Sequence, residues 1–552
     1  MSFYDQHQSI LQTAIKANQN REYFAQYPEN PKAYGEQAQA KGLADFQQMM
    51  NTDFSELLQT NPLRFEGEEV SPYLQLGLGI RYPVFADKIL IKNALQTAPQ
   101  WAQTTINERA GILIECLEQI KNRFFDIAYA TMHTTGQSFV MSFQASGPHA
   151  NDRALEAIAM AYTELTRFPQ TATWEKPMGK SNITLHKTWS PIPKGIGLVI
   201  GCSTFPTWNS LTSIFANLMA GNSVIVKPHP KAILPIAIVV AEMQNVLSQI
   251  NLDPNTIQLA ADTSAHPLTK DLATDPNIKL IDYTGNSQFG TWLETLQSNQ
   301  KTIFTEKAGI NAVIIDSTDN LKAMCDNLAF SVSLYSGQMC TAPQNFFIPA
   351  DGIHTEQGHK TFDELCQTLA QSIDAIANNP KMGANVLGCI QNQHTHNRIG
   401  EAQKTDAKIL LASQDIENSD FKDALTASIA VLQIDADQTA LYEKEWFGPI
   451  VLLIKTKDTK QSITLAQQTA LKHGAISCAC YTTNPETQKE VAKIMNNAFT
   501  PVSFNLIGGV FVNQHAAFSD FHVTGGNPAG NASFTNPDYI NRRFVWVGNR
   551  TL

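Results

Sequence analysis

The sequence predicts an α/β protein with two regions of parallel β-sheet, and three observations support this. Short apolar runs alternate with segments of helix length between residues 197 and 283, a pattern typical of βαβ units. A second series of apolar runs follows from about residue 311 to residue 500. The chain has 552 residues, of which 43% are hydrophobic and 16% charged, so it can form several large cores. We therefore expect two α/β units in one globular protein.

The first 80 residues are polar and helical in character, and Pro28, Pro31 and Pro62 interrupt them. We interpret residues 1–80 as an N-terminal extension. A helix with one apolar face is predicted next, because apolar residues recur at steps of three and four. These residues are Ala110, Leu113, Leu117, Ile120 and Phe124. A further helix is predicted over residues 153–165, before two prolines.

The first α/β unit is expected to span residues 81–310. Its predicted strands cover residues 197–200, 223–227, 257–260 and 278–283. The predicted helices between them cover residues 208–220, 233–247 and 267–273. Open parallel sheets bind nucleotides at the carboxyl ends of their strands, so this unit is a candidate nucleotide-binding domain.

The second α/β unit is expected to span residues 311–500. Apolar runs that predict its strands cover residues 312–315, 450–454 and 477–481. We find no internal repeat and no low-complexity segment in the chain.

Residues 182–189 alternate between apolar and polar, which predicts an exposed β-arm near residues 180–195. The C-terminal segment, residues 501–552, is expected to complete this arm. An exposed strand of this kind needs a partner edge, so we expect a homodimer or homotetramer.

Charge and hydropathy exclude several classes of protein. The formal charge is −10 and no basic patch stands out, which argues against a nucleic-acid partner. The N-terminus lacks the features of a secretory signal, and the longest apolar runs, such as residues 233–240, are too short to span a membrane. We therefore expect a soluble, cytoplasmic protein without a membrane partner.

The chain contains eight cysteines, and their spacing predicts no metal site. No Cys-x-x-Cys pair occurs, and no histidine lies at metal-ligand spacing from a cysteine. In a reducing compartment most of these thiols should be buried, which is also the ordinary expectation for any one of them.

Cys340 differs from the other cysteines in its context. It follows Gly337 and lies among small residues on an apolar passage that we expect to run from a strand into a helix, as an exposed nucleophile would. Glu306 ends another apolar run, 34 residues upstream. A thiolate that attacks a carbonyl forms a thioester, and a nearby carboxylate can activate water to hydrolyse it. Burial is expected to raise the pKa of Glu306 towards the working pH, whereas the alternative is a surface residue paired with Lys307.

This cysteine and glutamate, in this order and spacing, resemble those of the aldehyde dehydrogenase superfamily. Four further segments match that family's pattern in order: residues 204–206, 221–228, 284–290 and 445–449. The resemblance runs from about residue 94 to residue 513. It implies a Rossmann-type nucleotide-binding domain, an α/β catalytic domain that holds Cys340, and a β-arm for oligomerisation.

The resemblance also implies residues that bind a nicotinamide dinucleotide. Lys227 would contact a ribose of the cofactor, and Glu445, beside Phe447, would hold the nicotinamide ribose. The turn beside the pyrophosphate would consist of Thr284, Gly285, Asn286 and Gly290. A cation at the end of a buried strand is costly without an acceptor, which favours a ligand at Lys227. Glycines allow close approach to phosphate, which favours a pyrophosphate beside Gly285 and Gly290. The ordinary alternatives are an exposed lysine, a simple glycine turn and a solvated charge run.

The sequence departs from the family pattern at two positions. Thr204 stands where the family has an asparagine that stabilises the oxyanion, so either the Thr204 hydroxyl or Asn209 would have to replace it. Pro230 stands where many NAD-preferring members have a glutamate, and Lys231 is adjacent. This departure favours NADP, with NAD as the alternative.

Within the family, residues 201–209 and 508–520 resemble the PaaN-type enzymes of phenylacetate degradation. The implied reaction is oxidation of 3-oxo-5,6-dehydrosuberyl-CoA semialdehyde to the acid, with a separate ring-opening hydratase as a possible partner. Three alternatives stay open: an enzyme for small aromatic or aliphatic aldehydes, a CoA-acylating aldehyde dehydrogenase, and a non-catalytic binding or assembly protein. Glu306 argues against the CoA-acylating type, which often lacks this base.

Overall fold

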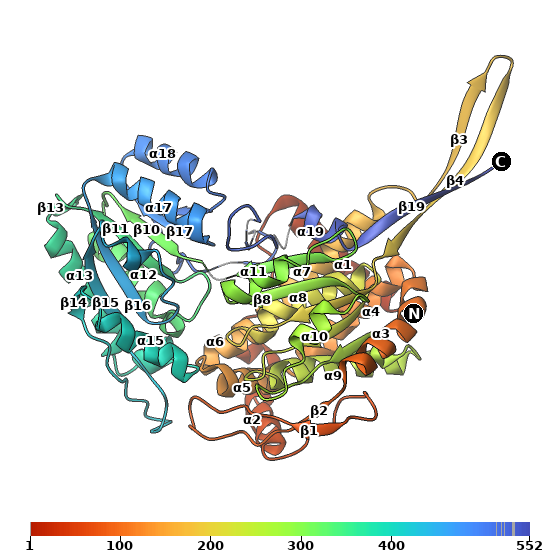
Figure 1. Ribbon diagram of the computed structural model, residues 1–552, viewed down its shortest axis with the longest axis horizontal. Helices are drawn as coiled ribbons and strands as arrows, with labels where there is room; N and C mark the ends of the chain where they lie inside the picture. The colour runs from red at the N-terminus through yellow and green to blue at the C-terminus, as the bar shows by residue number, and fades with distance from the viewer. Residues whose placement is uncertain (1, 308, 515, 520–521, 524, 533–535) are drawn as a thin grey trace.

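The structure is a computed structural model that describes residues 2–307, 309–514, 516–519, 522–523, 525–532 and 536–552. Two sheets form separate lobes, and a β-arm extends from one of them (Figure 1). The α/β class predicted from the sequence is confirmed.

The first sheet has five parallel strands in the order β7-β6-β5-β8-β9. They are β5 (Ile196–Ile200), β6 (Ser223–Lys227), β7 (Ile257–Leu259), β8 (Ile278–Gly285) and β9 (Thr302–Lys307). The strand order reverses at β5, as in nucleotide-binding α/β sheets, so the carboxyl ends of β5, β6 and β8 border a crevice.

Helices cover both faces of this sheet. One face packs on α8 (Pro206–Met219) and α9 (Leu234–Gln249), with α4 (Ile106–Lys121) and α7 (Ala150–Thr166) behind them. The other face packs on α3 (Asp87–Gln103), α10 (Thr269–Thr274) and α11 (Ser287–Glu294). The β5–β8 strands predicted from the sequence match within two residues, and Pro235 lies in the first turn of α9 as expected.

The N-terminal residues pack onto the helical layer rather than standing apart. Helix α1 (Phe3–Asn20) contacts α4 and α7, and α2 (Ala38–Met49) contacts α5 (Phe124–Thr135). Further short elements complete this lobe: β1 (Arg64–Glu66), β2 (Tyr82–Val84) and α6 (Phe139–Gln144). The extension thereby becomes part of the same core as the nucleotide-binding sheet.

The second sheet has seven strands in the order β14-β15-β16-β11-β10-β17-β18, and only the pairing of β14 is antiparallel. They are β10 (Asn311–Ile315), β11 (Pro343–Pro349), β14 (Lys408–Leu411), β15 (Ala430–Asp435), β16 (Ile450–Thr456), β17 (Cys478–Tyr481) and β18 (Val502–Phe504). Helices α12 (Leu321–Ser333) and α13 (Phe362–Ala377) cover one face. The other face packs on α15 (Gln393–Gln403), α17 (Thr459–His473) and α18 (Pro485–Asn496).

The arm is a three-stranded antiparallel sheet in the order β19-β4-β3. Its strands are β3 (Thr171–Met178), β4 (Ser181–Pro193) and β19 (Phe544–Thr551). The predicted arm near residues 180–195 with a C-terminal strand is therefore confirmed, but the sequence did not predict β3. Pro177 lies within it, and proline is tolerated there because β3 is an edge strand.

A buried ion pair fixes the C-terminal strand to the first sheet. Arg543, just before β19, donates from both terminal nitrogens to Asp282 of β8, at 2.6 and 2.8 Å. Tyr539 also donates its hydroxyl to Asp282, at 2.9 Å. Such bidentate pairing is geometrically specific, so it sets where the arm leaves the body.

Among the described residues, no helix combines the length and apolar character that crossing a membrane requires.

Candidate active site

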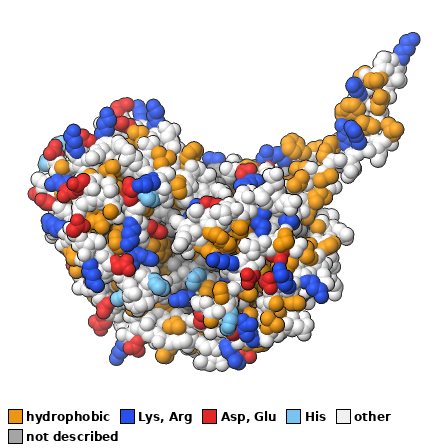
Figure 2. All heavy atoms as spheres, in the orientation of Figure 1, with side chains coloured by type: hydrophobic (Ala, Val, Ile, Leu, Met, Phe, Trp, Pro, Cys, Tyr) orange, Lys and Arg blue, Asp and Glu red, His pale blue; other side chains and the backbone are white. Residues whose placement is uncertain are grey.

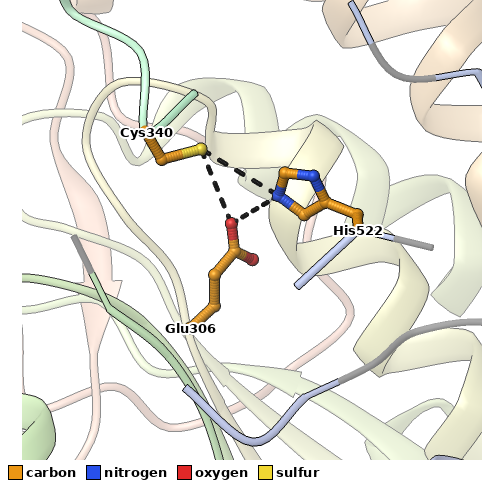
Figure 3. Close-up of side chains that lie close together, drawn as sticks. All are labelled: Glu306, Cys340 and His522. Atoms are coloured by element: carbon orange, nitrogen blue, oxygen red, sulfur yellow. Dashed lines mark hydrogen bonds and ion pairs between the residues drawn. The ribbon is translucent and has the colours of Figure 1, made fainter. Parts of the chain in front are cut away.

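The end of a strand and a loop bring Glu306 and Cys340 together between the lobes. Glu306 is the next-to-last residue of β9, at the carboxyl end of the first sheet. Cys340 lies between α12 and β11 of the second sheet, so the chain passes here from helix to strand, the reverse of the expected order. Its Sγ atom is 3.7 Å from Oε1 of Glu306, so the predicted nucleophile and base are neighbours (Figure 3).

A strained turn precedes Cys340. Tyr335 and Ser336 have left-handed φ values of 53° and 50°, and Gly337 follows with 63°. Each such non-glycine residue costs about 1–3 kcal/mol, so the surroundings must hold the turn. Tyr335 donates its hydroxyl to the Thr135 carbonyl at 2.6 Å, and Ser336 donates to the Leu387 carbonyl at 3.0 Å. The position of the nucleophile is thereby set by contacts to both lobes.

His522 completes the cluster, and the sequence did not single it out. Its Nε2 atom is 2.7 Å from Oε1 of Glu306 and 3.9 Å from Sγ of Cys340. The side chains of His522 and Glu306 are each 1% exposed. Figure 3 shows the imidazole edge facing both the carboxylate and the sulfur. His522 is two residues beyond the 508–520 segment, in a stretch without periodicity or spacing that would mark it.

The pKa of Glu306 is lowered, which corrects the expectation of a raised value. Burial by itself raises this pKa, as expected. The positive charge and hydrogen bond of His522 oppose burial, and Arg153 and a hydrogen bond from Asn209 add to them. Together these contacts hold the pKa of the carboxyl below its ordinary value. Glu306 is therefore a carboxylate at neutral pH.

The Cys340 thiol is neutral in this resting site. Burial raises its pKa well above the ordinary value, and the negative charge of Glu306 raises it further. A thiol is a poor nucleophile, so attack requires a proton acceptor. Glu306 is in position to accept this proton.

The two candidates for stabilising the oxyanion contact other groups. Asn209 donates from Nδ2 to Oε2 of Glu306 at 3.1 Å, and its side-chain oxygen accepts from the Cys202 thiol at 3.4 Å. The Thr204 hydroxyl lies 4.0 Å from Sγ of Cys202. Asn209 thus lies in the cluster, whereas the oxyanion role of either residue stays a prediction.

Aromatic side chains border the cluster. Trp208 meets His522 edge to face, with ring centroids 4.8 Å apart, and Phe205 lies beside Trp208 and Tyr335. The Arg153 guanidinium lies 5.1 Å from the Trp208 ring centroid and pairs with Glu156. The Arg153 side chain is only 1% exposed, so it is not a cation at the rim of the site. It belongs to the inner wall of the site.

The carboxyl end of β6 fits a cofactor ribose. Lys227 and Asp262 form an ion pair of 2.6 Å, with each side chain 2% exposed. Asp262 follows β7, and the sequence did not predict its role because nothing local relates it to Lys227. The pair offers both a cation and a carboxylate where such sheets bind nucleotides.

The predicted pyrophosphate turn lies at the start of α11. Asn286 caps the helix by accepting from the Phe289 amide at 2.9 Å. A Cβ atom at Gly285 would come within 2.4 Å of the Tyr283 hydroxyl, and one at Gly290 within 2.6 Å of the Lys307 side chain. A side chain at either glycine would therefore displace the neighbouring Tyr283 or Lys307 side chain. The Thr284 hydroxyl donates to Glu306 at 3.4 Å.

Glu445 and Phe447 line one pocket together with Cys340. Arg398 donates to the Phe447 carbonyl, which ties this turn to α15. Burial raises the pKa of Glu445 to about 7, although the positive charge of Arg398 opposes it. A carboxylate here, the Lys227–Asp262 pair and the α11 N-terminus fit a dinucleotide that ends beside Cys340.

Comparison with known proteins agrees with this geometry. The model of the "Aldehyde dehydrogenase family" matches residues 86–531. A crystal structure of an NAD-dependent aldehyde dehydrogenase from Burkholderia multivorans is 44% identical, covers 100% of this chain and 99% of that one, and has a TM-score of 0.96. The 1-pyrroline-5-carboxylate dehydrogenase of Bacillus subtilis is 22% identical over 405 residues, 71% of this chain and 73% of that protein.

More distant relatives share the fold. Benzaldehyde dehydrogenase [NAD(+)] of Pseudomonas putida is 20% identical over 461 residues, 82% of this chain and 87% of that protein. A glyceraldehyde-3-phosphate dehydrogenase from Methanocaldococcus jannaschii, complexed with NADP, is 17% identical, covers 89% of this chain and 99% of that one, and has a TM-score of 0.69. Since the family model spans most of the sequence and a solved relative matches its whole length, this chain belongs to the aldehyde dehydrogenase family.

Proposed function

We propose that this protein oxidises an aldehyde to a carboxylic acid with a nicotinamide cofactor, through a thioester on Cys340. The observation that carries the proposal is the 3.7 Å contact between the Cys340 thiol and the Glu306 carboxylate. Cys340 also lines a pocket together with Glu445 and Phe447, the residues proposed for the nicotinamide ribose. As a member of the aldehyde dehydrogenase family, this protein is an oxidoreductase.

In the first half-reaction the Cys340 thiol gives its proton to Glu306 while sulfur bonds to the aldehyde carbon. The electron pair of the carbonyl moves to oxygen, and a backbone or side-chain donor must hold that charge. Thr204 or Asn209 stays the proposed side-chain donor, although Asn209 would have to turn away from Glu306. The nicotinamide, when bound, accepts the hydride from this carbon, and a thioester remains.

In the second half-reaction Glu306 loses its proton to solvent and then takes one from a water molecule. The water oxygen bonds to the thioester carbon, the carbon–sulfur bond breaks, and the proton on Glu306 returns to Cys340. The acid leaves. A buried carboxylate beside the sulfur favours water over a second thiol as acyl acceptor, which supports hydrolysis over CoA acylation. Analysis of products with and without free CoA tests this choice.

We propose NAD as the preferred cofactor, in place of the NADP that Pro230 suggested. The sequence argument assumed that no carboxylate lies near Lys227. Asp262 pairs with Lys227 at 2.6 Å, and the charge of Glu68 acts on both residues. Two carboxylates at this strand end would accept ribose hydroxyls and repel a 2′-phosphate. The 44% identical relative is also named NAD-dependent.

Glu68→Gln is expected to narrow the preference for NAD. Removing one negative charge beside Lys227 reduces repulsion of a 2′-phosphate, so the ratio of kcat/KM for NAD to that for NADP should fall by roughly three- to ten-fold. Steady-state rates with each cofactor measure this ratio. Glu66→Gln is the matched control, because Glu66 contacts Arg64 and His266 instead. A wild-type preference for NADP would contradict the assignment.

For the substrate, we propose the CoA-linked semialdehyde of phenylacetate degradation, supported by the resemblance of residues 201–209 and 508–520. Arg153, Arg167 and Lys180 do not suit the binding of its phosphates. Arg153 is buried, Arg167 pairs with Glu164, and Lys180 lies at the tip of the arm. The second candidate is a small aromatic aldehyde, which the rings of Phe205 and Trp208 beside the cluster favour.

Comparing one semialdehyde with and without CoA separates these substrates. If remote groups of CoA are bound, kcat/KM should be higher for the CoA-linked form by about 100-fold or more. Equal values would leave the small aromatic aldehyde as the better candidate. A separate hydratase that opens the ring would then lose its place as a proposed partner.

The arm supports a proposed homodimer or homotetramer. Its β3 and β19 strands leave both edges of the sheet open, and apolar side chains project from it (Figure 2). Val545 and Val547 are 52% and 45% exposed. An exposed apolar arm of this kind is expected to pair with another copy of the chain.

Replacing both Val545 and Val547 with Asp should dissociate the assembly. Buried charges oppose association, so sedimentation should change from an even-numbered oligomer to a species near 60.9 kDa. Leu471→Asp is the control, because Leu471 is 47% exposed on α17, away from the arm. A wild-type protein that sediments only as the monomer would contradict the proposal.

A further inference from the structure

His522 is a buried imidazole that contacts both reacting groups and the Trp208 ring beside them. Its Nε2 atom lies 2.7 Å from Oε1 of Glu306 and 3.9 Å from Sγ of Cys340. An N–O separation of 2.7 Å is that of a charge-assisted hydrogen bond, so a proton lies between the two residues. The imidazole therefore acts on the carboxylate that the proposed mechanism uses as its base.

The imidazole ring packs against Trp208. Trp208 meets it edge to face at an interplanar angle of 85°, and the Arg153 guanidinium lies over the Trp208 ring, 5.1 Å from its centroid. Arg153 pairs with Glu156 at 2.8 Å, and Glu156 accepts the backbone amide of Phe518 at 3.0 Å. Phe518, four residues before His522, is thus anchored to α7.

The N-terminal extension supports the same anchor. Phe24 packs edge to face on Phe518, with ring centroids 5.1 Å apart. Asn18 donates to the Glu156 carbonyl at 3.1 Å, and Gln26 donates its amide to Asp152 at 3.0 Å. The extension therefore braces both α7 and the loop that carries His522.

Charges around Glu306 decide its protonation. Burial opposes the ionised form, whereas His522 and Arg153 favour it and a hydrogen bond from Asn209 assists. Cys340 faces the same carboxylate, and Cys202 lies behind Asn209. His522 is the largest of the groups that counter burial. Removing it should raise the pKa of Glu306.

We propose that His522 is a positioning residue that donates Nε2–H to Glu306, aims this carboxylate at Cys340, and turns the same N–H to the sulfur as the thiol loses its proton. The proton from sulfur passes to Oε1 of Glu306, and Nε2–H then faces a thiolate instead of a carboxylate. The imidazole keeps its own proton throughout. This inference rests on the proposed thioester mechanism and assigns it a third residue.

The test compares His522→Gln, which keeps an N–H donor, with His522→Phe, which removes it. We expect the Phe variant to slow both the NADH burst and alkylation of Cys340 by iodoacetamide at pH 7 by roughly 100-fold. Its steady-state rate should also fall at a higher pH than in the wild type, since Glu306 then takes up a proton more readily. The Gln variant should stay within about five-fold of the wild type.

Three controls make the comparison decisive. His133→Gln replaces another buried histidine, which is hydrogen-bonded to Ser71 and not to Glu306 or Cys340. EDTA is present throughout, because Cys340, Glu306 and His522 are also a possible ligand set for zinc. If the Phe variant does not fold, His522→Ala with added imidazole replaces it, and restored alkylation supports the proposal.

The proposal would be overturned if the Phe variant alkylated Cys340 at the wild-type rate and its steady-state rate had the wild-type pH dependence. A Gln variant as slow as the Phe variant would also overturn it, because His522 would then act through its own protonation. Failure of the mechanism itself is distinguishable, since Cys340→Ala would then stay active whatever residue occupies position 522.

Discussion

Cys340→Ala is expected to lower aldehyde oxidation by at least about 10⁴-fold, because no other described thiol can form the thioester. Burial raises the pKa of the nearby Cys202 thiol to about 11, and this thiol donates a hydrogen bond to Asn209. NADH formation under saturating aldehyde measures the loss. Cofactor binding should be retained, since Lys227 and Glu445 are unchanged.

Cys366→Ala is the matched control for this variant. Cys366 lies on the buried face of α13, in the core of the second lobe, and its loss should affect stability more than rate. Substantial activity in Cys340→Ala would mean that hydride transfer proceeds without a covalent bond to this sulfur.

Glu306→Gln is expected to separate the two half-reactions. A single burst of NADH should remain, because a thiol can still lose its proton slowly to solvent, whereas steady-state turnover should fall by about 10²–10⁴-fold. Wild-type Glu306 has a lowered pKa, so its base stays ionised as the pH falls below neutral. Steady-state rates of the wild type should therefore decline only at acid pH. Rapid mixing followed by absorbance of NADH measures both phases.

Glu69→Gln is the control for removing a buried carboxyl. Glu69 has a pKa raised to about 7 by burial, and it caps α9 by accepting the Leu234 amide at 3.0 Å. The amplitude of the NADH burst and the steady-state rate should change together in Glu69→Gln. Unimpaired steady-state turnover in Glu306→Gln would contradict the assignment of Glu306 as the base.

The sequence predicted those parts of the fold that local patterns determine. Strands β5, β6 and β8 are short apolar runs between helices, so their existence and order followed from periodicity. Strand β3 was missed because Pro177 signals a break unless the strand is known to lie at an edge. Whether β3 lies at an edge depends on how the whole sheet assembles, which the local sequence does not determine.

The candidate site was predicted only where residues lie in family motifs. Cys340 and Glu306 stand in such motifs, and the structure places them in contact. His522 and Asp262 come from segments that carry no local signal, and only the fold brings them to Glu306 and Lys227. The expected rise in the pKa of Glu306 was wrong for the same reason. Burial could be anticipated, but the opposing charge of a histidine 216 residues away could not.

The most direct test of the account is the mass of the peptide that contains Cys340, measured in Glu306→Gln after one turnover with aldehyde and NAD. Blocked hydrolysis should leave the acyl group on this cysteine, so the peptide should gain the mass of the acid minus water in nearly every molecule. The adduct should be absent without NAD and from Cys340→Ala. A full NADH burst with an unmodified Cys340, or with the acyl group on another residue, would contradict the thioester mechanism.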